Sequence, residues 1–203
     1  MYVPKPYQAS DEDHIRSFVK HHPFGILVDQ MPSRLWAVHI PFEWEVREGK
    51  DYLVGHIARA NPLGEHWTAA RNVLAIFQGP HTYISSSWYK EEEVPTWDYL
   101  AVHVYGTLRT LSEEETMASL KRLVHRHESQ EEHPIDLEQF SESTMRQVRG
   151  VIGFEMEITE SHGVAKLSQT RPEDHEEIRK QLQKRGDEQS QQIADEIRKR
   201  NPA

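Results

Sequence analysis

Apolar and polar positions alternate along much of this chain, and the alternation is clearest between Asp98 and Leu111. Leu100, Val102 and Val104 fall on one face there and the intervening residues fall on the other, as in a half-buried strand. Shorter apolar runs bounded by turn residues predict further strands. These runs are Phe24–Val28, Leu35–Phe42, Tyr52–Ala58, Val73–Gln78 and His81–Ile84.

Turn residues between the runs indicate an antiparallel arrangement. Met31-Pro32-Ser33 predicts a turn between the first two strands, and Gly79-Pro80 predicts a break between two later ones. Apolar residues alternate again over 152–158. Ser161-His162-Gly163 then predicts a turn that sends the chain back along Val164–Gln169. We therefore expect a hairpin in this part of the chain.

Capping residues predict helices between the strands. Ser10 and Asp13 resemble a capping box for a helix over 10–21, and Asn61-Pro62 predicts a helix start with a short helix at His66–Ala70. A second capping box, Ser112 with Glu115, opens a helix that runs through Val124. A further helix is expected over Glu142–Arg149.

The C-terminal segment differs in composition from the rest of the chain. After Arg171-Pro172 the sequence is helical and highly charged, and Gly186 interrupts it. It lacks a broad apolar stripe until Ile193 and Ile197. We therefore divide the chain into a domain over 1–171 and a charged helical tail over 172–203, and we expect that tail to be exposed or packed against a partner.

The fold class follows from the number and length of the strands. Seven or more short strands with inserted helices favour a mainly β fold, a closed or nearly closed antiparallel barrel, because closure removes unpaired strand edges. A doubly wound fold fits poorly. The chain holds neither a Gly-x-Gly-x-x-Gly motif nor a Walker loop, so no standard nucleotide cradle is predicted.

Composition narrows the functional classes. The formal net charge is -9, which disfavours direct binding to DNA phosphates. The 203 residues include no cysteine, which excludes disulfides, thiolate metal sites and cysteine nucleophiles. The N-terminal residues lack an apolar signal core, and no stretch reaches the roughly 20 apolar residues that span a bilayer. We therefore expect a cytoplasmic protein that does not enter a membrane.

The segment from Gly55 to Pro62 combines a strand end, an arginine and a helix start. Such a corner suits a phosphate, because Arg59 can donate two charge-assisted hydrogen bonds and backbone N–H groups at a helix start point toward an anion. The alternative is structural: Asn61 caps its helix and Arg59 pairs with an acidic side chain.

Aromatic and histidine residues give less specific signals. Trp88, Tyr89, Trp97 and Tyr99 flank a long polar loop, where they can contact a flat ligand, pin the loop or fill a subunit interface. The histidines at 125, 127 and 133 have the spacing of metal ligands, but they lie at a helix end, which favours histidine anyway. We predict no metal site. Ser85-Ser86-Ser87 lacks the nucleophile elbow of a serine hydrolase.

Several longer motifs in the chain together are specific enough to compare with known families. They are Gly55-His56-Ile57-Ala58-Arg59-Ala60-Asn61-Pro62, Phe77-Gln78-Gly79-Pro80-His81-Thr82-Tyr83-Ile84-Ser85, Ser87-Trp88-Tyr89, Val94-Pro95-Thr96-Trp97-Asp98-Tyr99, Ala101-Val102-His103-Val104 and Lys166-Leu167-Ser168-Gln169. In order and spacing this set resembles the PaiB-type family of FMN-binding negative regulators of transcription, named for its effect on protease synthesis and sporulation. The resemblance runs from Met1 to about Arg179. The acidic Glu91-Glu92-Glu93 and the segment after Arg179 depart from the family pattern.

The resemblance implies a flavin-reductase-like split β-barrel that forms a homodimer, with FMN in each of two clefts between the subunits. His56, Arg59 and Asn61 match the phosphate side of the site, and His39 could face the edge of the isoalloxazine ring. Trp88, Trp97, Lys166 and Gln169 match further cofactor-binding positions without individual roles.

Three functional classes stay open on the sequence. The first is a repressor that senses flavin and acts on protease-synthesis and sporulation genes, with regulation through flavin redox state or a partner protein. The second is a small flavin-dependent oxidoreductase, which would need a substrate cavity beside the flavin. The third, a haem-handling split barrel, would need an axial histidine. An absorption spectrum of the purified protein separates flavin from haem.

Overall fold

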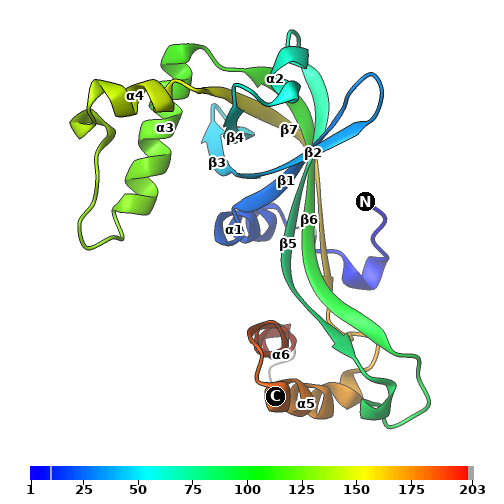
Figure 1. The fold of residues 1–203 in the computed structure, drawn as a ribbon. Coiled ribbons are helices and arrows are strands. Elements are labelled where there is room, and N and C mark those ends of the chain that lie inside the picture. The colour runs from blue at the N-terminus through cyan, green and yellow to red at the C-terminus, as the bar shows by residue number, and fades with distance from the viewer. Residues whose placement is uncertain (10, 201–203) are drawn as a thin grey trace. The chain divides into compact units, whose positions relative to one another are not determined.

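A seven-stranded sheet is the main feature of the fold (Figure 1). The structure is a computed structural model, and it describes residues 1–9 and 11–200. The strands are β1 (Phe24–Gln30), β2 (Leu35–Pro41), β3 (Glu43–Arg47), β4 (Lys50–Ala58), β5 (Arg71–Ile84), β6 (Thr96–Thr110) and β7 (Val151–Lys166). Their order in the sheet is β2-β1-β5-β6-β7-β4-β3, and β1–β2, β1–β5, β3–β4 and β4–β7 pair antiparallel. The predicted mainly β fold is confirmed.

Within the described residues, six α-helices lie before, between or after the strands. They are α1 (Glu12–His21), α2 (Pro62–His66), α3 (Glu113–Glu128), α4 (Glu142–Val148), α5 (His175–Arg185) and α6 (Glu188–Arg200). The capping box of α3 is present in full, because the Ser112 hydroxyl accepts from Glu115 N–H and the Glu115 carboxylate accepts from Ser112 N–H. Ser10, the predicted cap of α1, lies outside the described residues. Among those that are described, no helix is long and apolar enough to cross a membrane.

The chain divides into two compact units, each assembled from separated segments. The first unit comprises 1–18, 77–103 and 161–203, and the second comprises 19–76 and 104–160. Strands β5, β6 and β7 contribute residues to both units because each of them passes from one into the other. The predicted boundary between 1–171 and 172–203 stays a prediction.

The core of the second unit is built around Phe154 on β7. The rings of Phe42 and Trp67 meet it edge-on, at centroid distances of 6.1 and 5.2 Å. A Cβ atom at position 55 would lie 2.8 Å from the Phe154 ring, so only glycine leaves room for this ring beside β4. Trp67 Nε1 donates to the buried Asp29, which Arg71 also contacts. The α2 corner is therefore held by both apolar packing and a buried ion pair.

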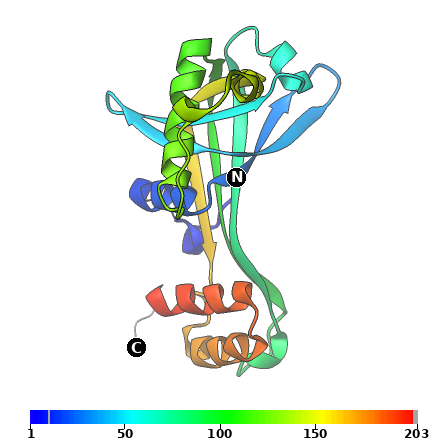
Figure 2. The ribbon, with the colours of Figure 1, turned by 60° about the vertical axis from the view of Figure 1, so that its left-hand side comes forward.

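The core of the first unit contradicts the exposed or partner-packed tail expected from the sequence. Helices α5 and α6 pack against each other, as both ribbon views show (Figures 1 and 2). Ile178, Leu182 and Ile193 are fully buried there, together with Ile84 at the end of β5 and Leu167 just after β7. Each helix has few apolar positions. Because the two short helices pack against each other and against the strand ends, a narrow apolar stripe on each is enough to form a buried core.

Two predicted strand interruptions are also wrong. Strand β5 continues through Gly79-Pro80, and β7 continues through Ser161-His162-Gly163 without a hairpin. Gly79 is needed for close packing, because a Cβ atom there would lie 2.8 Å from the Phe18 ring. Gly163 accepts a hydrogen bond from Ala9 N–H, and a Cβ atom at Gly163 would meet Ala9 O at 2.4 Å. These glycines mark close approaches of another segment instead of turns.

Two smaller differences concern the region from Phe42 to Arg71. The sequence did not predict β3, which follows β2 almost without a break. The helix expected at His66–Ala70 begins earlier, at Pro62, and ends at His66. The proline sits at the first helical position, which agrees with its fixed φ angle.

Candidate functional site

The predicted phosphate corner forms where β4 ends and α2 begins, within the second unit. Arg59 N–H donates to Gly150 O at 2.8 Å, and Arg59 Nη2 donates to Val151 O at 3.2 Å. Both bonds tie the corner to the start of β7. The Arg59 side chain is thereby held in place while remaining exposed to solvent.

Asn61 has the structural role that the sequence left open. Its Oδ1 accepts from Leu63 N–H at 3.1 Å, and its backbone carbonyl accepts from Gly64 N–H. These two N–H groups at the helix start therefore already donate hydrogen bonds to Asn61. The expectation that they offer free hydrogen bonds to a phosphate is therefore wrong for Leu63 and Gly64, and an anion at this corner would depend on arginine.

A cavity of about 610 Å³ opens beside Arg59. Its size falls within the range of small-molecule sites in proteins, roughly 300–1,000 Å³. Apolar side chains form part of its wall, including Trp67, Met117, Leu120 and Ile152. Arg149 lines it as well. The sequence did not indicate Arg149 or the α3 side chains as site residues, because only the fold brings α3 and the end of α4 to the β4 corner.

Charge is unevenly distributed around this cavity. Within 1–9 and 11–200, neither Arg59 nor Arg149 forms an ion pair with a carboxylate. Glu113 and Glu114, at the first turn of α3, also line the cavity. An anionic group is therefore favoured at the two arginines and disfavoured at the α3 end, although a helix N-terminus alone would attract it.

The two predicted histidines lie on strands of the same unit. His56, on β4, is half-buried, and burial lowers the pKa of its imidazole below the ordinary value, which favours the neutral ring. His39, on β2, is exposed and stacks on Phe24 with ring centroids 6.2 Å apart. Arg59 lines the cavity, whereas His39, His56 and Asn61 do not.

The other four predicted residues belong to the first unit. Lys166 Nζ donates to Trp97 O at 2.8 Å and also to the hydroxyl of Thr96. Gln169 accepts from Leu167 N–H and donates to Ala165 O, so it closes the turn after β7. Lys166 thus connects the end of β7 to the start of β6, Gln169 bonds to nearby backbone, and the role of both in cofactor binding stays a prediction.

The two tryptophans of the first unit have different surroundings. The Arg185 guanidinium lies 4.5 Å from the centroid of the half-buried Trp88 ring. Trp97 is 54% exposed, and its ring is flanked by His81 and Tyr83 at about 6 Å. Trp97 is therefore the more accessible of the two. Across residues 1–9 and 11–200, no three potential metal ligands come together.

Comparison with known proteins identifies a family over most of the chain. The family model described as "Putative FMN-binding domain" matches residues 1–160. "Protease synthase and sporulation protein PAI 2" of Bacillus subtilis (strain 168) is 34% identical over 197 residues, which cover 96% of this chain and 95% of that protein. An uncharacterized protein of Saccharomyces cerevisiae is 31% identical over 138 residues, covering 56% of this chain and 81% of that protein.

Solved structures share the fold at low sequence identity. An FAD- and haem-binding protein of Mycobacterium smegmatis has a TM-score of 0.60 and 13% identity, covering 79% of this chain and 73% of that one. A flavocytochrome of Azotobacter vinelandii has a TM-score of 0.61 and 14% identity, covering 81% of this chain and 72% of that one. The split-barrel fold class predicted from the sequence is confirmed by these likenesses.

Proposed function

Because this chain belongs to the FMN-binding family whose model it matches, the PaiB-type family, we propose that it is a homodimeric regulator that binds FMN between its subunits and represses protease-synthesis and sporulation genes. FMN is the cofactor that the family assignment supports. The position of FMN, the dimer and the repression are the parts that require experiment.

The observation that carries the proposal is Arg59, which lines a cavity and has no carboxylate partner in the described part of the chain. FMN carries a phosphate of about -1.5 to -2 charge near neutral pH, which a guanidinium can neutralise. The apolar wall with Trp67 and Ile152 suits a flat ring system. The residues present therefore fit the cofactor. Bound FMN would supply one- and two-electron redox chemistry, while the protein holds its phosphate and excludes water.

An apolar sheet face in the second unit supports the homodimer. The register pairs Ile26 of β1 with His39 of β2 on one side and Ile76 of β5 on the other, so these side chains share a face. Phe24 on the same face is 65% exposed. A monomer rarely leaves such a face uncovered, and a second copy can cover it with the same surface. His39 would then lie inside the interface.

The experiment for the dimer is light scattering at micromolar concentration. We expect twice the chain mass of 23.8 kDa for the wild-type protein. Ile26→Lys places a charge on the proposed interface and should give monomers, whereas Glu65→Lys, on the exposed side of α2, should not. A wild-type monomer would contradict the proposed homodimer.

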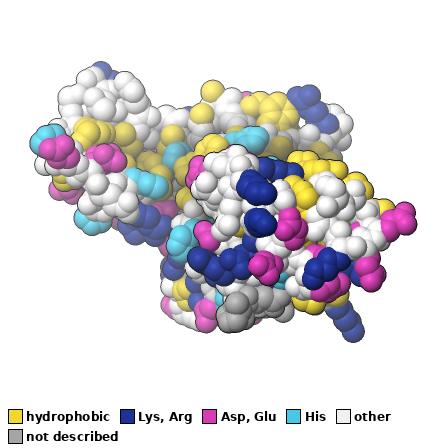
Figure 3. All heavy atoms as spheres, turned by 90° about the horizontal axis from the view of Figure 1, so that it is seen from below, with side chains coloured by type: hydrophobic (Ala, Val, Ile, Leu, Met, Phe, Trp, Pro, Cys, Tyr) yellow, Lys and Arg dark blue, Asp and Glu magenta, His cyan; other side chains and the backbone are white. Residues whose placement is uncertain are grey.

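Regulation without strong DNA binding is the second part of the proposal. The net charge is -9, and the face in Figure 3 carries Lys and Arg side chains interspersed with Asp and Glu. We expect weak, salt-sensitive binding to promoter DNA and regulation through flavin state or a partner protein. A footprint that persists at physiological salt would contradict this.

The Arg59→Ala variant tests the phosphate site. Truncating one partner of a buried charged pair costs about 2–5 kcal/mol, and because Arg59 is exposed we expect the lower limit, roughly 30-fold weaker FMN binding. Riboflavin, which lacks the phosphate, should bind wild type and variant alike. Flavin fluorescence titrations measure both ligands, with Arg198→Ala on the exposed end of α6 as the control.

Each outcome of that titration is informative. Equal loss of both flavins, or loss of neither, would mean that Arg59 only connects β4 to β7. An absorption spectrum of the purified protein separates FMN from haem, which is named for one protein of the same fold. A Soret band without flavin absorption would overturn the proposed cofactor.

A further inference from the structure

A second charged cavity lies between β3 and α3, and none of the predicted cofactor residues lines it. Its volume is about 450 Å³. It is lined by Glu43, Glu45, Val46, Arg47, Arg122 and Arg126. All six residues belong to the second unit. Three guanidinium groups and two carboxylates thus face a space large enough for a small metabolite.

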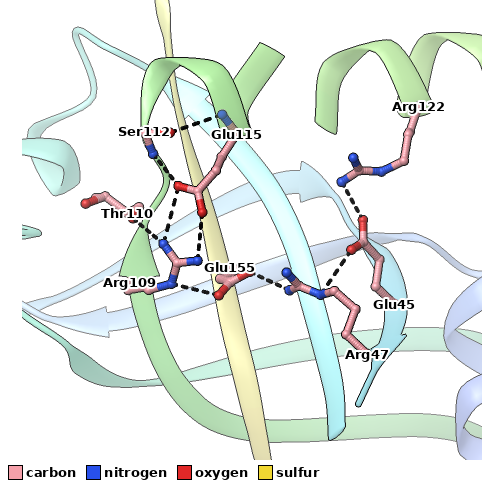
Figure 4. A network of polar contacts seen from close by, with 8 residues as sticks. All are labelled: Glu45, Arg47, Arg109, Thr110, Ser112, Glu115, Arg122 and Glu155. Atoms are coloured by element: carbon pink, nitrogen blue, oxygen red, sulfur yellow. Dashed lines mark hydrogen bonds and ion pairs between the residues drawn. The ribbon is translucent and has the colours of Figure 1, made fainter. Parts of the chain in front are cut away.

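Most charges near this cavity neutralise one another in an alternating series (Figure 4). Arg122 pairs with Glu45, Glu45 with Arg47, and Arg47 with the buried Glu155. Glu155 also pairs with Arg109 at 2.7 Å. This series connects β3, β6, β7 and α3, and it leaves Arg47 paired with protein carboxylates on both sides.

Two arginines of α3 form fewer contacts with carboxylates than Arg47 does. Arg122 and Arg126 stand one helical turn apart, so they share a face of the helix. Arg122 donates from Nη2 to Glu45 Oε1 at 2.8 Å. Arg126 Nη1 lies 3.2 Å from Glu43 Oε1, but the orientation does not form a hydrogen bond. Both guanidinium groups are about half exposed and retain donors for a ligand.

Glu43 is the unusual member of the cluster. Its side chain is only 4% exposed, and its Oε1 has no hydrogen-bond partner in the described chain. Burial raises the pKa of this carboxyl group, and the charge of Arg126 opposes that shift only in part. A buried acceptor without a hydrogen bond is costly. Oε1 itself is closed to solvent, so a ligand in the cavity would approach the Glu43 carboxylate through its other oxygen. The contact of Glu43 with Arg126 is therefore an ion pair that leaves Oε1 without a hydrogen bond.

We propose that the cavity binds a free acidic α-amino acid, with its ammonium group donating to Glu43 and its two carboxylates paired with Arg122 and Arg126. The lining side chains carry a net charge of +1 when all are ionised, from three arginines and two glutamates, and such a ligand carries -1. Side chains one turn apart begin about 5–6 Å from each other, a spacing that the two carboxylates of L-glutamate can reach.

Three probes that differ by one group test this on the full wild-type chain by isothermal titration calorimetry. L-glutamate is expected to bind. Glutarate lacks the ammonium group and L-glutamine lacks the second carboxylate, so each should bind at least about 10-fold more weakly, as the loss of one charge-assisted hydrogen bond predicts. Absence of L-glutamate binding up to millimolar concentration, or equal binding of all three probes, would overturn the proposal.

Substitutions in the cavity wall test which side chain binds each charged group of the ligand. Glu43→Gln should remove the preference for L-glutamate over glutarate, and Arg126→Gln should weaken both of these probes about 10-fold. Lys121→Gln is the matched control, because Lys121 lies on the same helix but pairs with Glu138 and does not line the cavity. Circular dichroism verifies folding. If folded Glu43→Gln kept the full preference for L-glutamate, the assignment of the ammonium site would be wrong.

Discussion

The burial of Asp98 leads to a prediction about the pH dependence of stability. This β6 residue is fully buried in the first unit, where Oδ1 accepts from Ser168 N–H and Oδ2 accepts from Ser168 Oγ. Burial raises the pKa of Asp98 from 3.8 to about 6, although the hydrogen bonds from Ser168 and the charges of Lys166 and His175 lower it. Desolvation outweighs them because the ionised carboxylate has lost its water.

The sign of the pH effect follows from this raised pKa. The folded chain keeps the proton of Asp98 up to about pH 6, whereas the unfolded chain loses it near pH 3.8. The contribution of Asp98 to stability is therefore fully present below pH 3.8 and is lost as the pH rises through 6. The shift of about 2 pKa units corresponds to roughly 3 kcal/mol at neutral pH, of which about 2 kcal/mol lies between pH 4 and pH 7.

Asp98→Asn removes the titration and can retain both contacts, since an amide accepts from Ser168 N–H and donates to Ser168 Oγ. We expect the variant to gain about 2 kcal/mol relative to wild type on going from pH 4 to pH 7. Urea denaturation at both pH values measures this double difference, which cancels the titration of other groups. The control is Asp195→Asn on the exposed side of α6. Parallel pH profiles for Asp98→Asn and wild type would refute the reasoning.

Three further substitutions test the packing and the ion pairs. Gly163→Ala should displace residues 1–9, because its Cβ atom would meet Ala9 O at 2.4 Å, and limited proteolysis should then cleave this segment at least several-fold faster. Unchanged cleavage would contradict the close approach. Ile193→Ala should cost about 2–5 kcal/mol of unfolding free energy, since the side chain is fully buried on α6, whereas Gln183→Ala on exposed α5 surface should stay within about 0.5 kcal/mol. Glu155→Gln should cost about 1–3 kcal/mol in urea denaturation, less at high salt, because Glu155 pairs with two half-exposed arginines; a variant as stable as wild type would show that the network adds nothing.

The sequence predicted most of the strands, helices and turns whose formation depends on residues close together in the chain. The alternation around Val102, the capping box at Ser112 and the turn at Met31-Pro32-Ser33 depend on neighbouring residues, and all three predictions are confirmed. The glycines at 79 and 163 misled the prediction because turn chemistry and close packing require the same residue. Only the segment that approaches each glycine, through Phe18 or Ala9, distinguishes the two cases.

The candidate site was predictable only in part for a related reason. Arg59 belongs to a contiguous motif, so the sequence could single it out. Arg149, Glu43 and Arg126 acquire their significance from contacts between strands and helices distant in sequence. No periodicity reveals that a carboxyl group such as Glu43 is both buried and without a hydrogen bond.

The division into two units bears on the order in which the protein can fold during synthesis. The second unit ends at residue 160, so it can be complete before residues 161–200 have left the ribosome. The first unit starts with residue 1, yet its core needs Ile193 and Ile197 at the far end of the chain. Residues 77–103 must therefore emerge long before the helices that bury Ile84. During that interval the nascent chain exposes apolar strand ends, and this is the stage at which a chaperone would contact it.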